Sequence, residues 1–307
     1  MRDRFVSTLM GLAAKDPNVH LVTGDLGFGV LKPFWERFPE QFTNAGIAEQ
    51  NMTSFAAGMA LEGKTVFTYS IGNFPTIRAL EQIRNDCAYH DANVKIVCVG
   101  GGFVYGSLGM SHHATEDLAI MRALPNVTVM APSDPSQAQL ATEAIYAHPG
   151  TCYLRLGRGG EPELNCPTDG FQIGRAMPVF DGEDVALLFT GAIGDEVLEA
   201  RETLAADGVS IAVVSFPTVK PIDEDAIADL ATRFGTLVTV EEHNVIGGLG
   251  GAVAEVLAEL PNPRARLVRV GLDDRYSSIV GSQKYLREVY GMSARKIADR
   301  VREVVHA

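Results

Sequence analysis

The sequence has no uninterrupted run of about 18 apolar residues, the length that a helix needs to cross a membrane. It begins Met-Arg-Asp-Arg-Phe, without an apolar run of the length of a secretion signal. Basic residues are few, since 26 Lys and Arg stand against 38 Asp and Glu and give a net charge of −12. This charge argues against binding to nucleic acid or to an anionic membrane surface.

The four cysteines lack the spacing of metal ligands, and the chain shows no repeats and no low-complexity segment. Cys98 and Cys152 stand in apolar, strand-like runs, so we expect buried, reduced thiols there. These absences predict a cytoplasmic enzyme.

With 307 residues, the chain is long enough for two α/β domains. In its first half, apolar runs alternate with amphipathic ones, and the apolar runs are continuous and β-branched, which is typical of a buried parallel sheet. The pattern predicts a doubly wound domain over residues 1–160. Strands are expected at 19–22, 65–69, 94–99, 127–130 and 152–156, and helices at 78–89 and 135–147.

A turn-rich linker is expected at residues 161–178, after which the α/β rhythm returns over residues 179–307. The fold class is therefore α/β, with two doubly wound domains. In the second domain, strands are expected at 185–190, 211–216, 237–240 and 267–270, and helices at 195–206, 223–234, 250–260 and 293–305.

One carboxylate, Glu49, stands at the head of an otherwise apolar helix that Gly63 is suited to end. The helix N-terminus favours a negative charge there, whereas burial disfavours it. Such a carboxylate can share a proton with a ligand nitrogen. The alternative for a lone Glu in this place is that it completes a helix cap.

The segment Gly-Ile-Ala-Glu-Gln-Asn-Met at 46–52 closely resembles the pyrimidine-binding domain of transketolases. The resemblance continues through 74–84, 106–117, Arg158 and 241–250, so it spans essentially the whole chain. It implies a pyrimidine-binding domain followed by a transketolase C-terminal domain, with thiamine diphosphate as the cofactor. Glu49 is then expected to bind N1′ of the aminopyrimidine and to promote loss of the proton at C2.

The resemblance also implies other cofactor contacts. Phe74 is expected to pack on the aminopyrimidine, a natural use of a flat ring, although an ordinary core Phe is the alternative. Ile47 and Ile77 are expected beside the cofactor, and Ile77 stands where transketolases often have an aromatic residue. Asp25 is a further candidate in the cofactor cleft, but its residue type alone favours a strand-end turn.

His112 lies in a Gly-rich loop after the strand at 94–99, at the carboxyl edge of the predicted sheet, where such folds bind ligands. The family resemblance implies that it contacts the substrate carbonyl and hydroxyl. An imidazole can donate to a developing alkoxide and relay protons near neutral pH. A metal site made with His113 is disfavoured because adjacent residues rarely converge on one ion.

Substrate recognition departs from the family pattern. Leu108 stands where most transketolases have an acid that reads a sugar hydroxyl. Gly100 and Gly29 replace a His and a Ser that contact the sugar phosphate. Arg158 keeps the phosphate-binding arginine, and Arg2 aligns with another. Hydrogen bonds of this kind carry much of substrate discrimination, so we expect ketol chemistry with an unusual acceptor or donor.

A Gly-Asp-Gly motif with its later Asn, which anchors Mg²⁺ and the diphosphate in this family, is missing, and Gly24-Asp25-Leu26 is no substitute. The chain thus resembles only the C-terminal half of a transketolase. We expect an N-terminal partner subunit that supplies the Mg²⁺ ligands, a ketose donor, and an α2β2 heterotetramer with a β–β contact. Gly247–Gly251 lacks the spacing of a dinucleotide loop, and the resemblance implies a subunit contact there.

Two alternatives remain open. One is the β subunit of a 2-oxoacid dehydrogenase E1 component, which passes its two-carbon unit to a lipoyl or carrier-protein arm. The absence of the acid at Leu108 is compatible with an acceptor that is tethered to a protein. Residues 46–52 and 218–223, in contrast, look more like a transketolase. The other is a non-catalytic scaffold subunit, which retention of Glu49 and His112 argues against.

Overall fold

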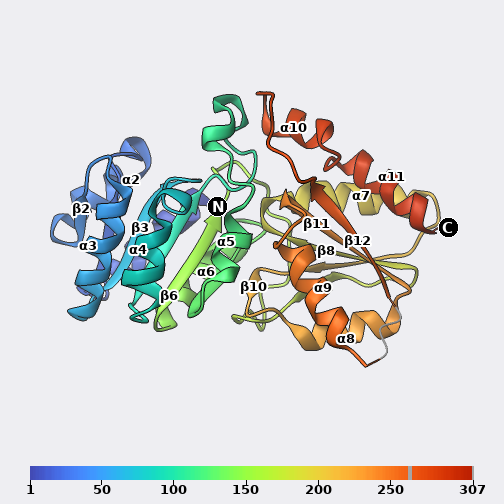
Figure 1. The fold of residues 1–307 in the computed structure, drawn as a ribbon, viewed down its shortest axis with the longest axis horizontal. Helices are drawn as coiled ribbons and strands as arrows, with labels where there is room; N and C mark the ends of the chain where they lie inside the picture. Colours follow the sequence, from blue (N-terminus) through green and yellow to red (C-terminus); the bar gives the residue numbers. More distant parts are fainter. Residues whose placement is uncertain (262–264, 306–307) are drawn as a thin grey trace.

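The computed structural model describes residues 1–261 and 265–305, which form two α/β units. Figure 1 shows the units side by side, the first in blue to green and the second in yellow to red. Each is built on one sheet. The first has strand order β10-β5-β6-β4-β3-β1-β2 and the second β12-β11-β8-β9-β7.

In the first sheet, the expected strands are confirmed, and they pair in parallel with both faces buried. The short edge strand β2 was not expected from the sequence; its three residues are too few to show a pattern. The strands are β1 (Val19–Thr23), β2 (Phe42–Asn44), β3 (Thr65–Ile71), β4 (Val94–Val99), β5 (Val127–Met130) and β6 (Thr151–Leu156).

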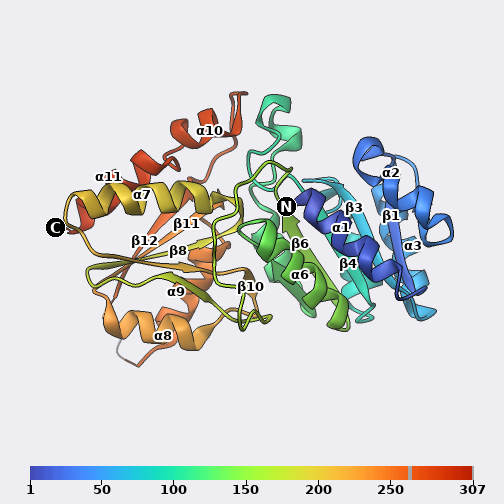
Figure 2. The same ribbon diagram turned by 180° about the vertical axis from the view of Figure 1, so that it is seen from behind.

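Helices cover both faces of this sheet. The side chains of α1 (Arg2–Ala13), α2 (Phe28–Arg37) and α6 (Pro135–Ala147) form one core with it, and Figure 2 shows α1 and α6 in front of the strands. On the other face, α3 (Glu49–Leu61) and α5 (Asp117–Ala123) form a second core. This is the doubly wound arrangement.

The segment expected as one helix at 78–89 is irregular. A 3₁₀ turn at Ile77–Ala79 leads into the short α4 (Leu80–Gln82) and then into a π-helical stretch at Ile83–Ala88. The wider π turn keeps Ile83 and Cys87 buried against the core. The amphipathic pattern thus predicted the buried face correctly but not the regularity of the backbone.

The second unit has the predicted α/β alternation. Its strand β10 (Thr218–Lys220) leaves this unit and adds to the first sheet, antiparallel to β5, so that backbone hydrogen bonds join the two units. The other strands are β7 (Met177–Phe180), β8 (Val185–Thr190), β9 (Ile211–Ser215), β11 (Thr236–Asn244) and β12 (Arg266–Leu272), and the helices are α7 (Gly194–Ala206), α8 (Glu224–Arg233), α9 (Leu249–Glu259), α10 (Gln283–Val289) and α11 (Ala294–Val305).

The four cysteines are buried and free, which confirms the expectation for Cys98 and Cys152. Of the helices in the described part of the chain, none combines the length and the apolar character needed to cross a bilayer.

His20 gives the first testable prediction. It lies on β1, is 8% exposed and hydrogen-bonds Thr43 through Nε2 at 2.9 Å. Burial, with a smaller effect of the Lys64 charge, lowers the pKa of His20 to about 4 from about 6.5 in the unfolded chain. Between these values the unfolded state binds more protons, so the free energy of unfolding should fall as the pH drops from 6.5 through 4.

His20→Gln removes this titration and keeps a polar partner for Thr43. Urea unfolding at pH 7.5, 5.5 and 4.5 should therefore show a shallower acid loss of stability in the variant than in the wild-type chain. Equal losses in both proteins would contradict the assignment.

Candidate active site

The candidate residues lie along one edge of the first sheet. Arg158 follows β6, His112 follows β4, Phe74 follows β3, Asp25 follows β1 and Glu49 follows β2. In the order of the sheet these are successive parallel strands, so all five residues follow carboxyl ends, where open α/β sheets bind ligands. Adjacent strands lie about 4.8 Å apart, so the row of strands spans about 19 Å.

Glu49 is nearly buried at the head of α3, with 2% exposure. Its Oε2 accepts a hydrogen bond from Nη1 of Arg78 at 2.8 Å. The residue before the helix is Ala48, and no side chain caps this end. The carboxylate thus pairs across the edge of the sheet with Arg78.

Arg78, Phe74 and His112 continue the row from Glu49. The Arg78 guanidinium carbon lies 4.5 Å from the centre of the Phe74 ring, a cation–π contact. The Phe74 and His112 rings meet edge to face with centroids 5.1 Å apart. The structure therefore brings together three residues that the sequence singled out, and it adds Arg78. The signal for Arg78 in the sequence was its place in the segment 74–84 of the family resemblance.

A close approach of two loops places His112 beside Phe74. The Gly72 backbone has φ +43°, and a Cβ atom there would lie 3.1 Å from the His112 carbonyl oxygen, so a side chain would strain this contact. The Ser111 hydroxyl lies 3.0 Å from Nδ1 of His112. When that hydroxyl donates to Nδ1, the proton of the ring sits on Nε2.

Charged groups from both units hold the loop that carries His112. The buried Glu242 carboxylate of β11 accepts the Phe103 N–H at 2.6 Å and pairs with Arg287 of α10. Buried Arg155 of β6 donates from Nη2 to the carbonyls of Ala114 and Glu242, at 2.8 and 2.9 Å. Separating buried, paired charges of this kind is costly, so groups from the two units together fix both ends of the loop.

A second group lies toward β6. The Arg158 guanidinium carbon is 5.5 Å from the centre of the Tyr105 ring. Gly100 has φ +93°, and a Cβ atom there would lie 2.2 Å from that ring, so Tyr105 fills the place of a side chain at 100. Arg2 lies against Gly159, the neighbour of Arg158. Burial raises the pKa of Tyr105, and the charges of Arg158 and Arg2 oppose that rise.

The remaining candidates form the rim of this edge. Ile47, Ile77 and Leu108 expose 76%, 43% and 55% of their surface, which leaves apolar area for a ligand or a partner to cover. Asp25 accepts a hydrogen bond from Nδ2 of Asn44 at 2.8 Å.

His113 differs from its neighbour. It is buried edge-on against Phe103, and burial lowers its pKa, so a packing role fits it. Among residues 1–261 and 265–305, no group of three or more His, Cys, Asp and Glu residues is arranged to hold a metal ion.

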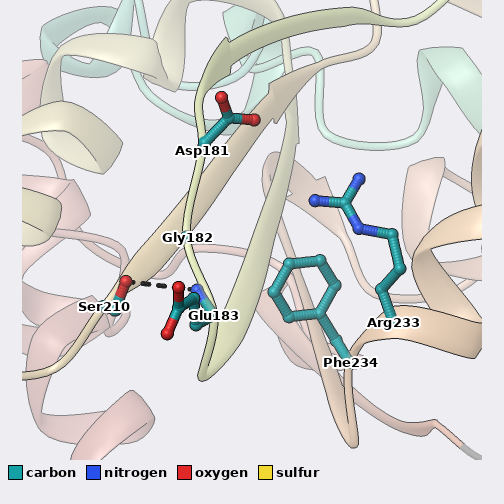
Figure 3. Close-up of a pocket in the computed structure, with 6 residues that line it drawn as sticks. All are labelled: Asp181, Gly182, Glu183, Ser210, Arg233 and Phe234. Carbon is teal, nitrogen blue, oxygen red and sulfur yellow. Dashed lines mark hydrogen bonds between the residues drawn. The ribbon is translucent and has the colours of Figure 1, made fainter.

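A cavity of about 560 Å³ lies elsewhere, in the second unit (Figure 3). Glu183 of this cavity donates its N–H to the Ser210 hydroxyl at 3.1 Å. The residues that line the cavity directly precede β8, β9 and β11. They therefore lie at the amino ends of those strands, opposite the edge where such folds bind ligands. We assign it no part in the site. Asp181, Gly182, Glu183, Ser210, Arg233 and Phe234 line it.

Comparison with known protein families identifies both units. The family described as "Transketolase, pyrimidine binding domain" matches residues 1–161, and "Transketolase, C-terminal domain" matches residues 174–297. The chain therefore belongs to the transketolase family, which depends on thiamine diphosphate. Its two domains are those of a transketolase C-terminal subunit.

Individual relatives match this chain over nearly its whole length and over nearly their own. A putative transketolase C-terminal section of Methanocaldococcus jannaschii is 40% identical over 99% of this chain and 95% of that protein. A 6-deoxy-6-sulfo-D-fructose transketolase subunit of a Clostridium species is 38% identical over 99% and 94%. A solved structure described as a split gene transketolase, an inactive β4 tetramer, has TM-score 0.88 and 36% identity over 99% and 97%.

Proposed function

We propose that this chain is the C-terminal, β-type subunit of a two-subunit transketolase. The enzyme transfers a two-carbon ketol unit from a ketose donor to an acceptor, in a site completed by an N-terminal partner. The observation that carries this proposal is the nearly buried Glu49 carboxylate, in a row with Phe74 and His112 at the carboxyl edge of the pyrimidine-binding domain.

The residues of this row fit the aminopyrimidine of thiamine diphosphate. A flat ring whose nitrogen can share a proton with a carboxyl group suits both the buried Glu49 side chain and the half-buried face of Phe74. In this proposal, Ile47 and Ile77 pack at the rim of that ring, and Asp25 shapes the cleft; the exposed isoleucines and the Asn44–Asp25 hydrogen bond support these roles. The bound cofactor supplies the electron sink that lets the bond next to a ketose carbonyl break.

Glu49 and His112 handle protons in this proposal. The Glu49 carboxylate shares a proton with the ring nitrogen and is held for this by the first turn of α3. His112 donates from Nε2 to the substrate oxygen, with its ring oriented by Ser111 and by the edge-to-face contact with Phe74.

The diphosphate and its Mg²⁺ belong to the partner subunit in this proposal. The described residues include no cluster of metal ligands at this edge, and the sequence lacks the motif that would supply one. We propose an α2β2 heterotetramer with a β–β contact in which Gly247–Gly251 take part. The relative described as an inactive β4 tetramer supports contacts between β chains and the need for a partner.

Substrate recognition follows from the second group of residues. Arg158 and Arg2, with the Tyr105 hydroxyl, are suited to a terminal anion of the sugar. Exposed Leu108, with Gly29 and Gly100, offers no side-chain hydrogen bonds from these three positions to the hydroxyls of an ordinary aldose. The relative that acts on a sulfonated sugar supports an atypical substrate.

The relatives favour a transketolase over the E1-component alternative. The row of side chains from Glu49 to His112 argues against a non-catalytic scaffold subunit, which would have no need of it. A cytoplasmic location stays a prediction, and the buried, free cysteines support it.

Glu49→Gln tests the central assignment. The change keeps the shape of the side chain but removes the shared proton, so thiamine C2-proton exchange in the assembled enzyme should slow by about a hundredfold or more. Glu62→Gln, an exposed change at the other end of α3, is the matched control. A rate within about threefold of wild type, a fraction of a kcal/mol of barrier, would rule out the role.

The isolated chain should neither turn over substrate nor bind thiamine diphosphate tightly, because the Mg²⁺ ligands are expected from the partner. The measurement is a calorimetric titration of the lone chain with cofactor and Mg²⁺, followed by an activity assay. Tight binding and turnover by this chain alone would refute a shared site.

Ribose 5-phosphate should be a poor acceptor for the assembled complex. Each hydrogen bond lost at positions 29, 100 and 108 leaves a polar group of the acceptor unpaired when the assembled site buries it, at a cost of about 1–3 kcal/mol. The measurement is the kcat/KM for ribose 5-phosphate with a good ketose donor. A value above about 10⁴ M⁻¹s⁻¹ would show an ordinary pentose-phosphate specificity.

A further inference from the structure

The guanidinium of Arg78 makes the two contacts that the proposed function assigns to the aminopyrimidine. It is flat, it donates an N–H to the Glu49 carboxylate at 2.8 Å, and it lies over the Phe74 ring at 4.5 Å. A second flat, N–H-bearing group cannot use the same carboxylate oxygen and the same ring face at the same time.

We propose that Arg78 takes the place of the aminopyrimidine when no cofactor is bound and sets the affinity for the cofactor by competing with it. The contact of Arg78 with Glu49 and Phe74 is called the Arg78 latch below. This inference rests on the proposed function, since it takes Glu49 and Phe74 as the cofactor contacts.

The two partners differ in their freedom to move. The Glu49 side chain is 2% exposed and is held at the head of α3, whereas the Arg78 side chain is 47% exposed. Arg78 also lies within the 3₁₀ turn Ile77–Ala79, which leads into the irregular segment 80–88, outside any long helix. Opening the latch therefore requires Arg78 to turn into solvent while Glu49 stays in place.

The latch gives Glu49 a partner when no cofactor is bound. A carboxylate removed from water needs an opposite charge or hydrogen bonds, and Arg78 supplies both. The apparent dissociation constant of the cofactor is then the intrinsic constant divided by the fraction of sites with an open latch. A latch that is closed in about nine sites of ten weakens binding about tenfold.

The test compares Arg78→Ala with wild type in the complex of this chain with its N-terminal partner. Arg84→Ala is the matched control, because Arg84 is exposed two turns further on and bonds the neighbouring Asn85. Stopped-flow mixing with thiamine diphosphate and Mg²⁺ measures the association and dissociation rates. Calorimetry measures the dissociation constant.

Arg78→Ala should raise the association rate about tenfold and tighten binding by the same factor, with the dissociation rate unchanged. Arg84→Ala should behave as wild type. A merely structural role for Arg78 would not speed association. Unchanged or weaker binding by Arg78→Ala would overturn the latch, and weaker binding would show instead that Arg78 holds the bound cofactor.

A second measurement needs no cofactor. In the isolated chain, the shifts in Tm caused by Arg78→Ala and Glu49→Gln should be strongly non-additive in the double variant, because each change removes the same ion pair. Additive shifts would show that the pair is not formed in solution, which also overturns the latch.

Failure of the latch is distinguishable from failure of the proposed function. The proposed function and the latch are both refuted if the wild-type complex binds no thiamine diphosphate. They are also both refuted if Glu49→Gln changes neither cofactor binding nor C2-proton exchange. If cofactor binding and C2-proton exchange depend on Glu49 but cofactor binding is unchanged by Arg78→Ala, only the latch is refuted.

Discussion

The Glu49 carboxylate has to be held out of water at the end of a helix, and the rest of the site is arranged around that constraint. Moving such a group from water costs several kcal/mol unless a charge or a set of hydrogen bonds replaces the lost hydration. In the subunit alone, Arg78 supplies that replacement at 2.8 Å. In the assembled enzyme we propose that a ring nitrogen of the cofactor takes over, so cofactor binding exchanges one partner of Glu49 for another.

The fold meets this constraint through the order of its strands. Parallel pairing puts the residues after β3, β4 and β2 on one edge, so that Phe74, His112 and Glu49 converge although the sequence separates them. The second unit adds rigidity, because β10 joins the first sheet and Glu242 fixes the backbone of the His112 loop. The C-terminal domain can thus act on the geometry of the site through these contacts.

The sequence predicted well those parts of the fold that local pattern determines. Runs such as 94–99 and 185–190 are buried on both faces, so continuous apolar character identified them as strands. Strand β10 was not predicted because its three residues belong to the sheet of the other unit, which no local pattern reveals. The irregular backbone at 77–88 was missed because a π turn preserves an amphipathic spacing.

The site was predictable to a similar degree. The resemblance supplied Glu49, Phe74 and His112, and the structure brings them into one row, whereas their roles stay predictions. Arg78 and Tyr105 were missed because their importance depends on contacts with Glu49 and with Gly100, which only the tertiary structure creates.

The most direct test is an experimental structure of the chain with its N-terminal partner, thiamine diphosphate and Mg²⁺. We expect the Glu49 carboxylate within hydrogen-bond distance of N1′ of the aminopyrimidine, the ring against Phe74, and Arg78 turned away from both. An aminopyrimidine bound to a carboxylate of the partner subunit, with the Arg78–Glu49 pair intact, would contradict the central claim.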